Sequence, residues 1–139
     1  MNLTSLATDN ITEMLTTIVK FTQTREKILI KNIINVHSPG FVPQELEVDE
    51  FSILLNHAIE EHVRNQRLVL CDTENIKFGA GGSLELKPIV DVQGEKLLLE
   101  NQDEYIEWQI DKLWENLLSQ KVAAELLRQK EDEFAQINC

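Results

Sequence analysis

Residues 25–43 read REKILIKNIINVHSPGFVP, and this stretch decides where the first long helix of the chain ends. Its first half continues a helical pattern, with apolar residues at Ile28 and Ile33 and no glycine or proline before Pro39. Pro39 lacks an N–H donor and its ring clashes with the preceding turn, so a helix has to stop before it. Gly40 then allows a backbone conformation that other residues resist. The stretch therefore predicts a helix followed by an abrupt turn.

Two asparagines, Asn32 and Asn35, stand just before this break. Asparagine is a poor helix-interior residue, because its side-chain amide competes for backbone hydrogen bonds. We expect both amides to cap the end of the helix and to bond a specific group there. The alternative is an ordinary helix C-terminus followed by a Ser-Pro-Gly turn, and the residues by themselves favour that alternative.

The pattern N-I-I-N-x-x-S-P-G-F at residues 32–41 resembles the N-terminal motif of the bacterial flagellar axial proteins, the family of rod and hook proteins. The family pattern is roughly N-I-A-N-x-x-T-P-G-Y, so that Ser, Phe and Ile here replace Thr, Tyr and a small Ala. The resemblance implies an assembly motif that bonds an adjacent subunit. Its residues would be Asn32, Asn35, Ser38, Pro39, Gly40 and Phe41.

Length and composition are those of an ordinary globular chain. The 139 residues suffice for a single domain over residues 1–139, with 42% hydrophobic and 27% charged residues. The net charge of −11 argues against nucleic acid and against an anionic membrane surface as partners, because both attract clustered Lys and Arg. No apolar run reaches the about 20 residues that a membrane-spanning helix needs, so we expect no membrane insertion.

The start of the chain, MNLTSLATDNITEML, has no basic cluster and no apolar block, so it does not resemble a cleaved signal peptide. Two lone cysteines, Cys71 and Cys139, indicate neither a disulfide framework nor a metal-ligand cluster. Taken alone, these features favour a cytosolic protein. The family resemblance implies another location, the flagellar basal body, reached through the flagellum's own type III export channel without a cleaved signal.

A heptad-like seam predicts a first helix over residues 10–36, with Asn10 and Glu13 as a capping pair. Arg25 and Asn32 interrupt the seam with polar groups, which fix register at a cost in stability. We expect this helix to pack against other helices along its whole length. The alternative is a surface helix that packs once against its own domain. The apolar seam residues are Ile11, Met14, Ile18, Phe21 and Ile28.

The middle of the chain predicts a second helix over residues 49–67, capped by Asp49. Residues 76–99 have strand-like and turn-like content, and we expect a small β-hairpin-like insert with a turn at Gln93-Gly94. The apolar face of the middle helix comprises Phe51, Leu54, Leu55, Ala58, Ile59 and Val63.

The last helix is predicted over residues 101–138, where Asn101 and Glu104 form a second capping-box pair. A helix of about 35 residues is about 50 Å long, which exceeds what a compact domain of this size needs. We therefore expect its wide apolar surface to have partners beyond its own chain. The seam residues of this helix include Ile106, Ile110, Leu113, Leu117, Ala124 and Leu127, and Trp114, Leu118, Val122 and Leu126 widen the apolar surface.

The pattern K-L-x-E-N-L-L-x-Q at residues 112–120 resembles the C-terminal helix of a proximal-rod member of the flagellar family. The length of this chain also resembles that of the proximal-rod member, because hook and distal-rod proteins are longer and carry large inserted domains. The resemblance implies a self-assembling structural subunit whose terminal helices join a helical core. Its partners would be further copies, other rod subunits and basal-body proteins.

No residue pattern indicates catalysis, so we expect no enzyme, no cofactor and no metal. His57 and His62 are five residues apart, which separates them by about 140° on a helix and favours a solvated face over a metal site. The glycines of residues 79–83 lack the Gly-Lys-Ser/Thr end of a phosphate-binding loop, which favours a flexible loop.

Together these patterns predict a mainly α fold in which long N- and C-terminal helices pack antiparallel, in a coiled-coil-like manner. A shorter middle helix and a small β-hairpin-like insert lie between them. The function implied by the resemblance is a subunit of the proximal flagellar rod. The alternative is a cytosolic helical adaptor or chaperone-like protein-binding module, which would use the same apolar faces and stay in the cytosol.

Overall fold

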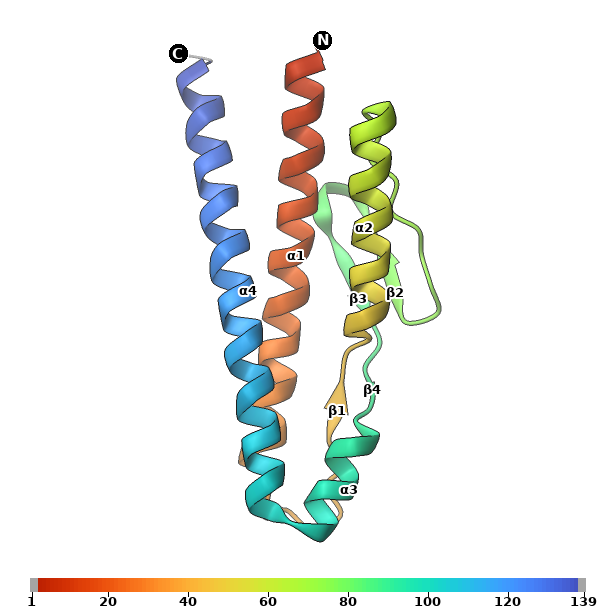
Figure 1. The fold of residues 1–139 in the computed structure, drawn as a ribbon, viewed down its shortest axis with the longest axis vertical. Coiled ribbons are helices and arrows are strands. Elements are labelled where there is room, and N and C mark those ends of the chain that lie inside the picture. The colour runs from red at the N-terminus through yellow and green to blue at the C-terminus, as the bar shows by residue number, and fades with distance from the viewer. Residues whose placement is uncertain (1–2, 138–139) are drawn as a thin grey trace.

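Two long antiparallel helices form the frame of the molecule in the computed structural model, which describes residues 3–137 (Figure 1). Helix α1 spans Leu3–Ile34 and helix α4 spans Gln102–Ile137, and they pack against each other more extensively than any other two elements. The predicted mainly α fold with paired terminal helices is confirmed. Asn138, the expected last residue of the C-terminal helix, lies outside the described residues.

The expected cap at Asn10 is wrong, because α1 begins at Leu3 and Asn10 lies within the helix. Asn10 is only 7% exposed, and its amide nitrogen contacts Nδ1 of His62 at 3.3 Å and donates to the carbonyl oxygen of Gln66 at 3.2 Å. The side chain therefore satisfies its polar atoms by joining α1 to the following helix. A capping pattern is a local signal, and this tertiary contact overrides it.

Helix α2 spans Val48–Asn65 and lies on the other side of α1 from α4 (Figure 1). Glu47, not Asp49, precedes it as the N-cap residue, and no side chain caps this end. Asp49 instead lies in the first turn, where its negative charge complements the helix dipole. Gln66 ends the helix in the left-handed conformation with φ 56°.

The strands form two short antiparallel pairs. Strand β2 (Ile76–Phe78) pairs with β3 (Leu84–Leu86), and β1 (Gln44–Glu45) pairs with β4 (Ile89–Val90). The β2–β3 hairpin lies within the predicted insert. The expected turn at Gln93-Gly94 is wrong, because helix α3 (Val92–Glu100) occupies this position. Asp91 accepts a hydrogen bond from the Gly94 N–H at 2.9 Å, so an aspartate N-cap decides the local structure.

The loop expected to be flexible contains a short 3₁₀ turn, η1 (Ala80–Gly82), which packs on α1. Gly82 is buried with φ +78°, and a Cβ atom at this position would lie 2.8 Å from Cγ2 of Thr16. The glycine therefore allows both the left-handed backbone and the close approach to α1. Residues 80–82 therefore form a packed turn, whereas the sequence predicted a flexible loop here.

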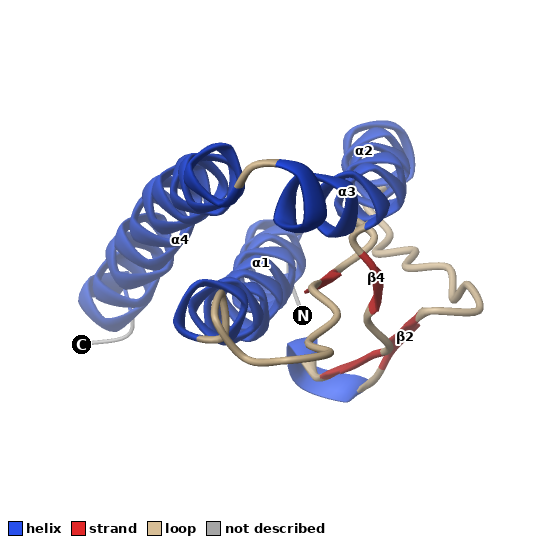
Figure 2. Cartoon of the chain, turned by 90° about the horizontal axis from the view of Figure 1, so that it is seen from below, coloured by secondary structure: helices blue, strands red, loops and turns tan. Residues whose placement is uncertain are grey.

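The apolar core lies between α1, α2 and the β2–β3 hairpin. Phe21 and Phe51 stack with ring centroids 3.9 Å apart, and Leu46 and Ile76 complete the buried cluster. Within the described part of the chain, no α4 residue belongs to this cluster or packs on it. Figure 2 shows α4 beside α1, with α3 connecting it to the strands. Contacts other than the apolar core therefore hold α4 in place.

Within residues 3–137, none of the helices combines the length and the apolar character that crossing a bilayer requires.

Candidate functional site

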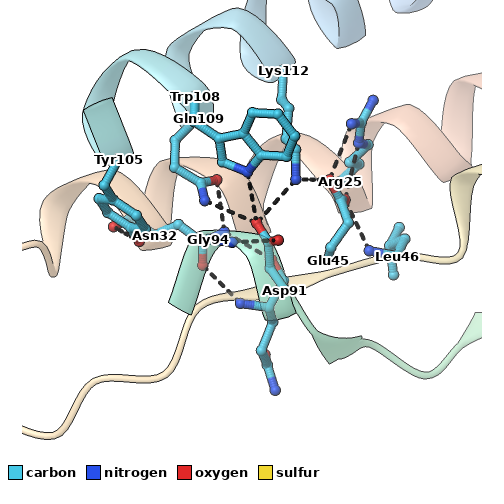
Figure 3. A network of polar contacts seen from close by, with 11 residues as sticks. Arg25, Asn32, Glu45, Leu46, Asp91, Gly94, Tyr105, Trp108, Gln109 and Lys112 are labelled. Carbon is cyan, nitrogen blue, oxygen red and sulfur yellow. Dashed lines mark hydrogen bonds and ion pairs between the residues drawn. The ribbon is translucent and has the colours of Figure 1, made fainter. Parts of the chain in front are cut away.

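A buried polar network joins α1 to α4 at the end of the molecule where α1 stops (Figure 3). Its central residue is Asn32, which is 1% exposed. The Asn32 amide donates to the carbonyl oxygen of Gln44 at 2.8 Å and to Oε1 of Gln109 at 3.0 Å. Its own Oδ1 accepts from the Gln44 N–H at 3.1 Å. We call this end of the molecule, with Asn32, Asp91 and Gln109, the motif end.

The expectation that Asn32 caps α1 is therefore wrong, and the bond from Asn32 to an adjacent subunit stays a prediction. Both donor hydrogens of the side chain are in use, and its carbonyl oxygen has a partner within the chain. The Asn32 backbone oxygen also accepts from the Tyr105 hydroxyl at 2.7 Å. Asn32 specifies how strand β1 and helix α4 dock on α1, because leaving these buried groups unpaired would be costly.

The outer half of the motif forms the turn that the sequence predicts. Asn35 donates to the carbonyl oxygen of Lys31 at 2.8 Å and accepts from the Ser38 hydroxyl at 2.9 Å, so it does cap the end of α1. The Phe41 N–H bonds the Ser38 oxygen at 3.2 Å, with Gly40 at φ +73° between them. This geometry is that of a type II turn with proline and glycine in the middle. Residues 38–40 are exposed and Phe41 is half-buried.

Asp91 is the anionic centre of the network and is 7% exposed. Besides the Gly94 N–H, it accepts from Nε2 of Gln109 at 3.1 Å, Nε1 of Trp108 at 3.3 Å and Nζ of Lys112 at 3.0 Å. One carboxylate therefore caps α3 and fastens the first turns of α4. The sequence signal that could have located it is an Asp directly before the start of a helix, a preferred N-cap residue, which the competing turn expectation concealed.

A second carboxylate, Glu45 on β1, lies beside this centre. Arg25 bonds it through Nε at 3.0 Å and Nη2 at 3.1 Å, and Nζ of Lys112 lies 3.3 Å away. Lys112 thus lies between Glu45 and Asp91, and its Nζ also lies 4.5 Å from the centre of the Trp108 ring. Two cations compensate two carboxylates, which makes this cluster an internal lock and not an anion or metal site.

The network shifts two pKa values in the directions its contacts require. Burial raises the pKa of Asp91, but the Gly94 N–H and Lys112 outweigh it, so the pKa lies below the ordinary value. Burial, together with the charge of Asp91, raises the pKa of Tyr105 to about 12. At neutral pH the carboxylate is therefore ionised and the phenol is protonated, the two forms that the hydrogen bonds need.

The seam of α4 that faces α1 differs from the predicted one by about one residue position. The buried positions are Tyr105, Gln109, Asn116 and Ala123, and Asn116 donates to the Thr22 carbonyl oxygen at 2.7 Å. The buried positions of this seam are half polar and half apolar, and Gln120 Oε1 is buried in it without a hydrogen-bond partner. The α1–α4 contact therefore combines side-chain hydrogen bonds with apolar packing.

The residues predicted to form the helix interface differ in how deeply they are buried. In α1, Met14 and Phe21 are buried, whereas Ile11, Ile18 and Ile28 are half-buried. In α4, Leu113, Leu117 and Leu127 are half-buried at the edge of the seam, and Ala124 is exposed. Ile110, expected in the seam, is 39% exposed and faces away from α1. Phe21 stacks on Phe51 of α2.

Away from the motif end, α1 and α4 expose apolar side chains. A groove of about 400 Å³ between them is lined by Leu15 and Ile18 from α1 and by Val122 and Leu126 from α4. Beside it, Trp114 is 64% exposed and Leu118 is 60% exposed. We call this half of the helix pair, with the groove and these two residues, the open end.

The other candidate sites have ordinary surroundings. His57 is exposed, and Glu61 accepts hydrogen bonds from Asn65 at 2.9 Å and from Arg67, just beyond the end of α2, at 3.0 Å. Cys71 is a free, exposed cysteine. Among the residues that the structure describes, no group of three or more His, Cys, Asp or Glu side chains is arranged to hold a metal ion.

Comparisons of this chain with protein-family models, with curated protein sequences and with solved structures gave no match. The functional proposal below therefore depends on the sequence motif and on the geometry of the two ends of the helix pair.

Proposed function

We propose that this chain is a structural, non-enzymatic subunit of the proximal rod of the bacterial flagellar basal body, most similar to flagellar basal-body rod protein B. The observation that carries the proposal is the pattern N-I-I-N-x-x-S-P-G-F at residues 32–41, at the end of a long N-terminal helix. The helix pattern at residues 112–120 supports the same family. The subunit would leave the cytosol by type III export and keep its N-terminal residues.

The arrangement of the motif suggests which half of it binds a neighbour. Asn32 is committed to contacts within the chain, whereas Ser38, Pro39 and Gly40 are exposed and Phe41 is half-buried. In the proposed rod, the turn over residues 38–41 contacts the adjacent subunit. The inner asparagine keeps that turn at a constant position relative to α4.

The open end supports assembly in a second way. Helix α4 continues to Ile137 with apolar side chains exposed on its outer face, and burying them is favourable by roughly 1.5–3 kcal/mol for each fully buried large side chain. Monomeric proteins seldom expose a continuous apolar surface of this kind without a partner. Neighbouring rod subunits would supply that cover.

A mass-spectrometric inventory of purified basal bodies tests the proposal directly. We expect the chain among the rod proteins, with its N-terminal residues retained. A strain carrying Gly40→Val, which places a β-branched side chain at φ +73°, should lose motility while the protein is still made. Val92→Ala, at a position 76% exposed on α3, serves as the matched control and should swim normally. Absence of the chain from basal bodies would contradict the proposal.

The groove at the open end favours a second candidate, a cytosolic helical adaptor or chaperone-like module that holds the apolar face of one partner. The same inventory separates the two functions. An adaptor stays in the cytosolic fraction, and its loss reduces the amount of its partner without removing a component from purified basal bodies.

A further inference from the structure

Helices α3 and α4 are separated by a single residue, Asn101. Its backbone is extended, with φ −156° and ψ 100°, whereas residues 92–100 before it and residues 102–137 after it are helical. Figure 1 shows that the chain reverses direction between these helices, with α3 running down to the lower end of the molecule and α4 rising from it. The backbone conformation of one residue therefore decides on which side of the bend α4 lies.

The sequence around Asn101 is also compatible with an uninterrupted helix. Residues 98–104 read LLENQDE, and neither glycine nor proline occurs in residues 95–137. Leucine, glutamate and glutamine are good helix formers, and a helix interior tolerates asparagine and aspartate at a small cost. Residues 99–104 are exposed, so little packing of their side chains holds the chain in the bent form.

The bend leaves backbone groups of both helices without helical partners. The first N–H groups and the last carbonyl groups of a helix have no partner within it. Asn101 compensates one of them, because its side-chain oxygen accepts from the Glu104 N–H at 3.2 Å. In a continuous helix, the N–H groups of residues 102–104 would bond the carbonyl oxygens of residues 98–100. Straightening the chain at Asn101 therefore exchanges one side-chain cap for three backbone hydrogen bonds.

The contacts that hold α4 on α1 lie outside this hinge. Gln109 accepts from Asn32 of α1 at 3.0 Å. Asn116 donates to the carbonyl oxygen of Thr22, also on α1, at 2.7 Å. A second copy of the chain carries an identical α4, which would find the same partners on this α1. Contacts that α4 loses in its own chain can therefore be regained in another.

We propose that Asn101 is the hinge of a domain-swapped dimer, in which α3 and α4 straighten into one helix over residues 92–137. Helix α4 of each copy packs on α1 of the other and makes the hydrogen bonds that it makes in the monomer. A two-fold axis near the hinge turns the second copy end to end, so each exchanged α4 remains antiparallel to the α1 that it contacts. Each straight helix is about 70 Å long.

The balance between the two forms depends on the hinge, because the contacts outside it are the same in both. Exchange of an identical element is for this reason a low-cost route to a dimer, and short connections that impose a bend favour it. The exchange goes beyond the proposed rod function and does not depend on it. It adds no new surface to the interface of α1 with α4.

Refolding of the full chain from urea, at low and at high micromolar concentration, tests the exchange when followed by sedimentation velocity in the presence of a thiol reductant. We expect monomer after dilute refolding and a dimer after concentrated refolding. The dimer should return to monomer only slowly on dilution, because α4 has to leave α1 first.

Two substitutions at the hinge should shift the dimer in opposite directions. Gln102→Pro should abolish it, because proline suits the first position of α4 but breaks a continuous helix. Gln102→Ala is the matched control and should form as much dimer as the wild type. Asn101→Ala removes the cap on Glu104 and should lower the dissociation constant at least about tenfold, since each dimer contains two hinges.

Amide hydrogen exchange of the wild-type dimer distinguishes a swap from any other association. The amides of residues 102 and 103 should be protected in the dimer and unprotected in the monomer. A chain that stays monomeric even as Asn101→Ala, a dimer that Gln102→Pro leaves intact, or a dimer in which these amides exchange as in the monomer would overturn the proposal. None of these results bears on whether the chain occurs in basal bodies, so the two proposals fail independently.

Discussion

The motif end and the open end of the α1–α4 pair are built on opposite physical principles. At the motif end, Asn32, Asp91 and Gln109 are buried, and the side chain of Gln109 connects the other two: its oxygen accepts from Asn32 at 3.0 Å and its nitrogen donates to Asp91 at 3.1 Å. At the open end, Trp114 and Leu118 are more than half exposed and make no comparable contacts. One end uses polar groups to specify a single arrangement, and the other leaves apolar surface for association.

The difference shows that the pairing of α4 with α1 and the tendency of α4 to associate with other molecules are separate properties. Buried polar groups tolerate only the arrangement that satisfies them, so they define register. Apolar groups are less selective and supply free energy of association wherever they are covered. Substitutions at the two ends should therefore affect different quantities, folding stability at the motif end and assembly at the open end.

The largest effect on folding is expected at Asp91. Asp91→Ala removes the acceptor of four hydrogen bonds and leaves Lys112 beside a single carboxylate, which should lower the free energy of unfolding by about 3 kcal/mol. Urea unfolding of the dilute protein measures this. The control Asp111→Asn, at an exposed position of the same helix, should change it by less than about 0.5 kcal/mol. Equal effects would show that the network is not a structural centre.

A smaller effect is expected from Asn32→Ala, which should cost about 2 kcal/mol because the Gln44 backbone and Gln109 lose buried partners. Asn35→Ala removes only a partly exposed cap and should cost less than about 1 kcal/mol. Thermal or urea unfolding of the two variants compares them directly. If Asn32→Ala reduced motility without reducing stability, Asn32 would have to act between subunits after all.

The stability of the motif end at alkaline pH depends on Tyr105, the single tyrosine of the chain. Its pKa is raised to about 12, so the folded form disfavours the tyrosinate. The stability contribution is fully present below the ordinary pKa of about 10 and is lost as the pH rises through 12. Ultraviolet absorbance should show tyrosinate forming near pH 12 in the folded chain and near pH 10 in urea.

Tyr105→Phe is the control for this titration, because it removes the ionisable group and keeps the ring. The stability of the Tyr105→Phe variant should not decline with pH in this window as the stability of the wild type does. A folded-state titration near the ordinary value would mean that the hydroxyl is accessible to solvent and that the hydrogen bond to Asn32 is not maintained.

The smallest effect on folding, with a large one on association, is expected at Leu118. Leu118→Asp should change the unfolding free energy of dilute protein by less than about 0.5 kcal/mol, because the side chain is already 60% exposed. In the assembled state the same charge would be buried unpaired, at a cost of several kcal/mol, and rods should not form. Leu117→Asp should also prevent assembly, but Leu117 is half-buried and its replacement should destabilise the isolated chain as well. Normal motility with either variant would argue against this face of α4 as an assembly surface.

Local signals in the sequence predicted the two terminal helices, the break at Pro39 and the Asn101 cap, whose Oδ1 accepts the Glu104 N–H at 3.2 Å. Each is decided by residues within one or two helical turns. The predicted capping roles of Asn10 and Asn32 were wrong for the same reason. Their partners are 12 to 77 positions away in the chain, and no capping pattern contains them.

The sequence by itself determined that this protein consists of two long helices with a turn and a small insert between them, since periodicity, capping residues and Pro39 act locally. It could not determine which side of α4 faces α1. The helix is apolar on several sides, so an apolar face cannot identify the contact, and Ile110 of the predicted seam is 39% exposed. Only the tertiary structure decided this, because Gln109 and Asn116 find hydrogen-bond partners on one side of α4, and that side must then be buried.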